Sequence, residues 1–330
     1  MNSRSIPAAI AVLSACVALH AGAAGIRPEC VVPAKAGGGF DFSCKLVQAM
    51  LKGHRPPAEA PVAINYVPGG IGAVAFDRAV REQLGDPGML VAFSSGSLLN
   101  LVQGKFGPHR PDSVRWLAVV GVDYGVVVVK AGSRIGSLQD LQGELARGAA
   151  RVVFGGGGTV GSQDWIKSAL LVRAAQKDHR AMRFVSFEGG GEALAALKAG
   201  HVDVYAGDAS EVRALLAEKP ASIKVIAVLA DRRLPGHLAQ TPTAREQGVD
   251  VAWSTVRGIY LGPGVSDADY RTWTLSFDRA MAAPGFRAMQ EAFGMYPMSL
   301  TGAAVGEFVT RQAAEYRAIA GQLNLRVAPH

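Results

Sequence analysis

Glycine-rich turns recur in this sequence where a β-strand pattern changes to a helical one. They lie at residues 36–41, 68–72, 94–97, 155–162 and 188–191. Each follows a short apolar or alternating run, which is typical of a strand, and precedes a segment with helical periodicity. This repeated order predicts an α/β fold with largely parallel sheets, and 330 residues leave room for two lobes.

The strand and helix patterns form two series, at residues 30–93 and 151–229, and the chain ends in three helical segments. The last run of the second series, 223–229, is almost entirely apolar and is interpreted as a central parallel strand. The β-rich segments 116–120 and 125–130 are placed to cross from one series to the other, and the β-rich segment 251–261 is placed to cross back.

Two such crossings would form a hinge, an arrangement that suits a binding protein whose two lobes close on a ligand. Residues 25–122 and 256–330 form lobe 1, which is discontinuous, and residues 123–255 form lobe 2. The ligand is then expected in the cleft at the carboxyl ends of strands in both lobes.

Residues 1–24 have the pattern of a signal peptide. Arg4 is their only charge, an apolar run spans 6–19, and small residues at 21–24 favour cleavage near Ala23 and Ala24, which predicts a periplasmic location. The run is shorter than the ~20 residues of a membrane span. Cys16 closes a segment that resembles a lipoprotein processing box, so lipid attachment there is the alternative.

Export would remove Cys16 and leave Cys30 and Cys44. An even pair in an oxidising compartment is a candidate disulfide, and these two residues flank one short loop. We predict the bridge; two buried free thiols are the alternative.

The formal charge of +7 favours anionic ligands, and no Lys/Arg run with interleaved aromatic residues indicates a nucleic acid partner. The histidines show no metal-ligand spacing, and no G-x-S-x-G nucleophile motif occurs. We therefore expect no metal, no cofactor and no catalytic residue, and we expect a monomer that is not an enzyme. An exported hydrolase would need a nucleophile that the sequence does not offer.

Glycine turns before helices suit anion binding. Glycine allows close backbone approach, and a helix start presents unpaired N–H groups at the positive end of the helix dipole. Several such turns converging from two lobes favour a small molecule with more than one carboxylate. For any single turn, tight-turn geometry or helix capping is the alternative.

Residues 156–161 also satisfy G-x-G-x-x-G, with Glu188 as a possible ribose-binding acid. An NAD(P)-binding oxidoreductase is therefore the alternative function. The export signal argues against it, and so does the gap of 27 positions from Gly161 to Glu188, which exceeds the usual ~20.

Several segments together resemble the Bug family of periplasmic binding proteins, in the variant found in TctC-type citrate binders. They are residues 33–41 (PAKAGGGFD), 65–73 (NYVPGGIGA), 187–194 (FEGGGEAL), 200–204 (GHVDV) and 241–249 (TPTAREQGV). The resemblance covers nearly the whole chain after residue 24. It implies an α/β, two-lobed periplasmic binding protein of the Venus flytrap type, with two hinge-crossing β segments. It implies a receptor that captures a citrate-like di- or tricarboxylate for the membrane subunits of a tripartite tricarboxylate transporter. A variant role is contact with a sensor kinase.

The resemblance also implies which residues bind the ligand, largely through backbone amides of the first-lobe turn and the second-lobe glycine turn. They are Gly37, Gly38, Gly39, Phe40, Asp41, Ser94, Ser95, Gly158, Thr159, Ser162, Glu188, Gly189 and Asp208. Because a Cβ would block backbone approach, valine at Gly39 or Gly158 is predicted to weaken binding and leave the fold intact.

Overall fold

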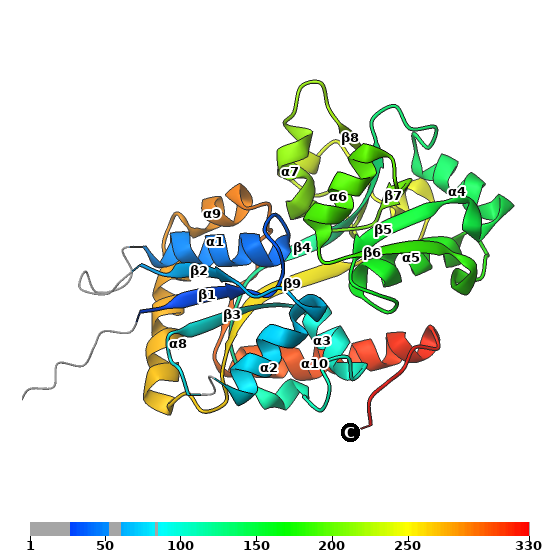
Figure 1. Cartoon of the computed structure of the whole chain (residues 1–330). Coiled ribbons are helices and arrows are strands. Elements are labelled where there is room, and N and C mark those ends of the chain that lie inside the picture. The colour runs from blue at the N-terminus through cyan, green and yellow to red at the C-terminus, as the bar shows by residue number, and fades with distance from the viewer. Residues whose placement is uncertain (1–26, 53–60, 83–84, 330) are drawn as a thin grey trace, which may run out of the picture.

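Two long strands, β4 (Arg115–Lys130) and β9 (Ser254–Leu261), run side by side between two α/β lobes (Figure 1). They pair antiparallel from Arg115 and Leu261 to Tyr124 and Ser254. This is a computed structural model that describes residues 27–52, 61–82 and 85–329. The expected signal peptide, its cleavage site and Cys16 lie outside the described residues. The mixed α/β, two-lobed architecture confirms the predicted fold class.

Lobe 1 is built on strands in the order β2-β1-β3-β9-β4, with β10 also paired to β4. The β1 strand is parallel to β2 and β3, whereas β9 is antiparallel to β3. Besides β4 and β9, the strands of this lobe are β1 (Glu29–Val32), β2 (Ala63–Tyr66), β3 (Met89–Ser94) and β10 (Leu300–Thr301).

Alternate side chains of the lobe 1 strands enter two different cores, as the period of two in a strand requires. Cys30 and Val32 face helices α1 (Gly39–Leu51), α8 (Asp267–Ala282) and α9 (Phe286–Ala292). Val31 faces the opposite layer, which contains α2 (Ala73–Arg81), α3 (Ser95–Val102) and α10 (Ala303–Gln322).

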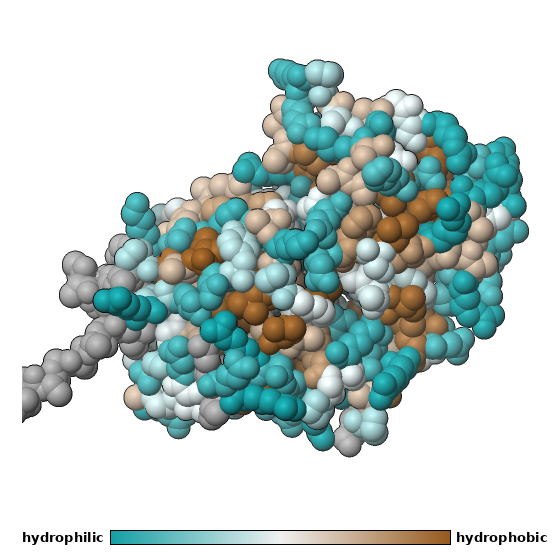
Figure 2. All heavy atoms as spheres, viewed as in Figure 1, coloured by the Kyte–Doolittle hydropathy of each residue, from teal (hydrophilic) through white to brown (hydrophobic). Residues whose placement is uncertain are grey.

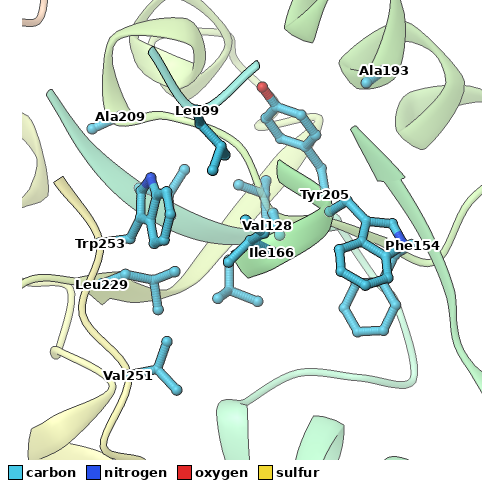
Figure 3. Packing of buried hydrophobic residues seen from close by; sticks show 14 of the residues in the cluster. Leu99, Val128, Phe154, Ile166, Ala193, Tyr205, Ala209, Leu229, Val251 and Trp253 are labelled. Atoms are coloured by element: carbon cyan, nitrogen blue, oxygen red, sulfur yellow. The ribbon is translucent and has the colours of Figure 1, made fainter. Parts of the chain in front are cut away.

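Lobe 2 places β5 (Val153–Gly157) between its parallel neighbours β6 (Arg183–Phe187) and β7 (Val204–Tyr205). The second half of β4 pairs antiparallel with β7 and β8 (Ile223–Leu229). The helices of this lobe are α4 (Leu138–Arg147), α5 (Gln163–Ala174), α6 (Gly190–Ala199) and α7 (Ala209–Leu216). Figure 3 shows Val128 of β4 and Ile166 of α5 packed closely in its core.

Short 3-10 helices connect several of these elements. They are Gly70–Gly72, Pro111–Ser113, Ala149–Arg151, His179–Ala181, Gly236–Leu238 and Arg245–Gln247.

One strand differs from its expected place. The apolar run 223–229 is β8, but it lies antiparallel to β4 at the edge of the lobe 2 ladder and is not a central parallel strand. A later segment covers its outer edge: the Val228 N–H donates to the Pro242 carbonyl, and the Ala244 N–H donates to the Val228 carbonyl. This cover keeps the strand buried, which explains its apolar sequence.

The predicted disulfide between Cys30 and Cys44 is confirmed. Cys30 lies in β1 and Cys44 in α1, and neither is exposed. The bridge therefore ties the first strand of lobe 1 to the helix that follows it.

The surface in view is mainly hydrophilic, with apolar residues in small separate patches (Figure 2). Among the helices of residues 27–52, 61–82 and 85–329, none combines the length and the apolar character that crossing a bilayer would require.

Candidate functional site

The turns that follow the strands of the two lobes meet around a cavity of about 50 Å³. A larger hollow of about 540 Å³ adjoins it, and the two share Ile71, Asn100, Ser162 and Glu188 in their walls. The cavity therefore forms the inner end of a cleft between the lobes, which is where the sequence places the ligand.

Most of the sequence-predicted binding residues lie on this cleft. The inner cavity is lined by Gly38, Gly39, Phe40, Ser94, Ser162, Glu188, Gly189 and Asp208. The outer hollow adds Gly158 and Thr159. Gly37, Asp41 and Ser95 line neither space.

Asp41 and Ser95 instead form contacts within the protein. The Asp41 carboxylate is fully buried and accepts hydrogen bonds from the Gly37 N–H and the Tyr66 hydroxyl, both at 2.9 Å. Ser95 Oγ accepts from the N–H of Val256 in β9 at 3.1 Å. These two side chains hold the first turn and a hinge-crossing strand in place.

The first turn of α1 points into the cleft. Its N-cap residue is Gly38, which has no side chain to cap the N–H groups at the helix start. The Gly39 N–H is met from the other lobe by Glu211 of α7, at 3.2 Å from Oε1. A carboxylate of this protein therefore already occupies the kind of amide site predicted to hold a ligand carboxylate.

Other contacts also join the lobes across the cleft. Gln103 Nε2 donates to the Gly161 carbonyl at 2.7 Å. Lys35 Nζ lies 2.6 Å from Glu192 Oε1. The two lobes are thus in direct contact, with the small cavity enclosed between them.

The second-lobe glycine turn is shorter than its sequence suggests. Glycines 155–157 belong to β5, and a Cβ on Gly156 would lie 2.6 Å from the Cβ of Asp164. The Gly157 N–H donates to Asp164 Oδ2 at 2.7 Å, so it is not free for a pyrophosphate. The glycines allow α5 to pack on β5, and the turn itself begins at Gly158, whose φ is +80°.

Arg257 is a cavity residue that the sequence analysis missed. It lies in β9 with 2% exposure, and its Nη2 donates to Asp208 Oδ2 at 2.6 Å and to Asp123 Oδ2 at 3.1 Å. Its Nε is buried and has no hydrogen-bond partner among the described residues. The available signal was a single charged residue inside a β-rich, apolar segment.

Lys167 of α5 forms a second buried ionic group with acids of lobe 2. Its Nζ lies 2.8 Å from Asp208 Oδ1 and 2.9 Å from Asp164 Oδ1. Burial raises the pKa of Asp208, but Lys167 and Arg257 outweigh burial and hold the pKa below its ordinary value. Burial raises the pKa of Asp164, which Lys167 only partly offsets.

Glu211 is an acid on the cavity wall with a strongly raised pKa. Its carboxylate forms a hydrogen bond with the Tyr205 hydroxyl and accepts one from the Asp208 N–H. Burial, followed by repulsion from Asp208 and Asp164, raises its pKa to about 7. Near neutral pH this residue therefore exchanges a proton readily.

The cleft can thus offer amide donors, a buried guanidinium and several carboxyl acceptors to a small polar molecule. Within residues 27–52, 61–82 and 85–329, no group of three or more His, Cys, Asp or Glu residues is arranged to hold a metal ion.

Comparison with solved structures shows the same fold over nearly the whole chain. MatC from Rhodopseudomonas palustris with bound malate has a TM-score of 0.75 at 20% identity, covering 89% of this chain and 98% of that one. A protein of the same bacterium with adipate gives 0.80 at 18% identity, covering 92% and 98%. The periplasmic binding protein BugD gives 0.79 at 17% identity, covering 91% and 98%.

No curated protein sequence matches the chain. The family described as the tripartite tricarboxylate transporter family receptor, TctC, matches residues 106–325. This match spans all of lobe 2 and the C-terminal part of lobe 1, including both hinge-crossing strands. The chain therefore belongs to the TctC family of solute receptors.

Proposed function

We propose that this protein is an exported, periplasmic solute-binding protein that closes its two lobes on a small molecule with at least one carboxylate. It passes this molecule to the membrane subunits of a tripartite tricarboxylate transporter. The observation that carries the proposal is the Gly39 N–H at the start of α1, which faces the cavity and binds a carboxylate, that of Glu211. Solved proteins of similar fold contain malate and adipate.

The same proposal covers the bounds of the lobes, the position of the hinge, and the processing and partners of the chain. Lobe 1 comprises residues 25–122 and 256–330, lobe 2 comprises 123–255, and bending occurs where β4 and β9 cross. The chain is cleaved near Ala23 and Ala24, acts as a monomer without a cofactor, and in a variant role contacts a sensor kinase. Its family is one of receptors, which favours binding over catalysis.

A citrate-like di- or tricarboxylate, as the first turn predicts, is the first ligand class to test. Two features favour the smaller members of the class. The inner cavity of about 50 Å³ holds only a handful of water molecules. Its wall also contains carboxyl groups that would repel a fully ionised tricarboxylate.

Titration calorimetry on the chain without residues 1–24 tests the proposal. The panel contains citrate, aconitate, tricarballylate, malate, succinate and adipate. We expect heat and a raised melting temperature with at least one member, because a ligand that binds the native state stabilises it by about 2.7 kcal/mol at one hundred times Kd. The absence of both signals across the panel would contradict carboxylate binding.

Gly189→Val locates the ligand. Gly189 lines the cavity, its backbone is extended, and a Cβ there would meet no atom within 4 Å. Valine should therefore fill the ligand space without disturbing the fold, and it should weaken binding at least ten-fold. The control is Gly143→Val, which adds the same side chain at an exposed position in α4 of the same lobe. Equal affinities in the two variants would place the ligand elsewhere.

A further inference from the structure

Acidic side chains dominate the wall of the inner cavity. Asp164, Glu188, Asp208 and Glu211 line it, against a single basic lining residue, Arg257. Two buried residues that pair with these groups add to the count. Asp123, beside Arg257, adds one carboxyl group, and Lys167, beside Asp208, adds one base. Around the cavity, carboxyl groups therefore outnumber bases by five to two.

Three polar atoms on this wall lack a hydrogen-bond partner within the described residues, and one of them, Asp164 Oδ1, lies 2.9 Å from Lys167 Nζ. Arg257, which is 2% exposed, has an unpartnered Nε, and Glu188 has a buried, unpartnered Oε2. A buried donor or acceptor without a partner destabilises the folded state, so such atoms are uncommon in a folded protein without a reason. The Arg257 atom is a donor and the Glu188 atom an acceptor, which suits a ligand with both kinds of group.

The charge balance discriminates between ligand classes. A second or third carboxylate placed beside an ionised wall acid would be repelled, and more strongly in this buried space than in water. An ammonium group at the same place would be attracted by a similar amount. On the lobe 1 side, the carboxylate of the ligand can take the Gly39 N–H in place of Glu211, and the Arg257 guanidinium lines the same cavity.

We propose that the ligand of this cleft is a small amino-carboxylate. Its carboxylate lies against the first turn of α1 and Arg257, and its ammonium group lies among Glu188, Asp208 and Glu211. This inference rests on the proposed function and narrows its ligand class. On binding, Glu211 leaves the Gly39 N–H to the ligand carboxylate and turns to the ammonium group.

This inference predicts the direction in which ligand affinity changes with pH. Glu211 faces Tyr205 of β7, Asp208 at the start of α7, Asp164 of α5 and Arg257 of β9. Its pKa of about 7 in the ligand-free protein must fall when an ammonium group binds beside it. Binding then releases a proton, so affinity rises with pH through about 7. A ligand with carboxylates alone would show the opposite slope.

Matched ligand sets test the inference by calorimetry between about pH 6.5 and about pH 8.5, where the ligand amines and carboxylates stay ionised. Within each set, an amine, a hydroxyl or a hydrogen occupies the same carbon. The sets are alanine, lactate and propionate; aspartate, malate and succinate; and glutamate, 2-hydroxyglutarate and glutarate.

We expect one amine member to bind at least ten-fold tighter than its two matched partners, with affinity increasing as the pH rises. Tighter binding of a hydroxyl or unsubstituted member, or affinity that increases on acidification, would overturn the amino-carboxylate and leave the proposed carboxylate receptor standing. If no member of the three sets and no member of the carboxylate panel binds, the proposed function fails as well.

The Glu211→Gln substitution removes the charge of this side chain and keeps nearly the same shape. It therefore tests whether the charge decides the ligand selectivity. The variant should bind the amine ligand at least ten-fold more weakly, bind the hydroxyl analogue no worse, and lose the pH dependence. Glu218→Gln is the control, because Glu218 follows the same helix but pairs with Lys198 on the surface. If Glu211→Gln fails to fold, Glu188→Gln, on a partly exposed residue, tests the same selectivity. An unchanged amine preference in the folded variants would refute the inference.

Discussion

Gly39→Ala should destabilise the ligand-free protein, because its Cβ would fall on the Arg257 guanidinium, well inside 3.0 Å. A flexible arginine could normally move aside. This one is 2% exposed and is held by Asp123 and Asp208, so moving it separates at least one buried ion pair. Breaking a buried pair costs about 3–5 kcal/mol. We therefore expect the free energy of unfolding to fall by about 3 kcal/mol or more.

Urea unfolding followed by circular dichroism measures this loss, and Gly38→Ala is the matched control. Gly38 has a φ of −106°, and the nearest atom to its Cβ would be Glu211 Oε1 at an ordinary 3.5 Å. The control should stay within about 1 kcal/mol of the unmodified protein. If Gly39→Ala unfolds at the same urea concentration as Gly38→Ala, then Arg257 is not held as the structure indicates.

Three further predictions concern stability and ligand release. Replacing Cys30 and Cys44 by serine should lower the free energy of unfolding by about 3 kcal/mol, since the bridge closes a loop with a sequence separation of 14; an unchanged urea midpoint would contradict this. The protein should be more stable at about pH 5.5 than at about pH 8, by roughly 2 kcal/mol. This follows because the folded pKa of Glu211, about 7, lies above its unfolded value of 4.5, so its contribution is lost as the pH rises through 7. A flat melting temperature over this range would count against that assignment. Gln103→Ala removes the hydrogen bond to Gly161 across the cleft and should speed ligand release about three- to ten-fold in stopped-flow measurements, whereas an identical rate would show that this bond does not hold the lobes together.

The fold could be predicted from the sequence because its signals are local. Each glycine turn stands between a strand pattern and a helix pattern, and both periods are visible within a dozen residues. Segments 116–120 and 125–130 looked like separate strands, but they form the single strand β4. The strand passes through Gly121, where a Cβ would come within 3.1 Å of Met295, so glycine there serves packing and does not end the strand.

The charged part of the site could not be predicted, because its partners are far apart in the chain. Arg257 binds residues 49 and 134 positions away, and the Gly39 N–H binds a carboxylate 172 positions away. No periodicity or spacing rule reports such pairs. For the same reason, the sequence predicts that valine at Gly39 leaves the fold intact, whereas the structure places a buried guanidinium beside it.

In the structure, Glu211 accepts a hydrogen bond from the Gly39 N–H. A ligand carboxylate that binds this N–H would therefore replace one carboxyl contact with another. In the proposed function, a cargo carboxylate displaces a tethered carboxyl group of the protein itself, whose local concentration is high and constant. The observed binding free energy is therefore the difference between the free energies of two similar interactions. The apparent affinity is weaker than that of either interaction alone. A receptor of this kind therefore half-fills at a higher cargo concentration than one whose Gly39 N–H is free. In the proposed function, the sequence of α7 thus helps to set the cargo concentration at which the receptor half-fills.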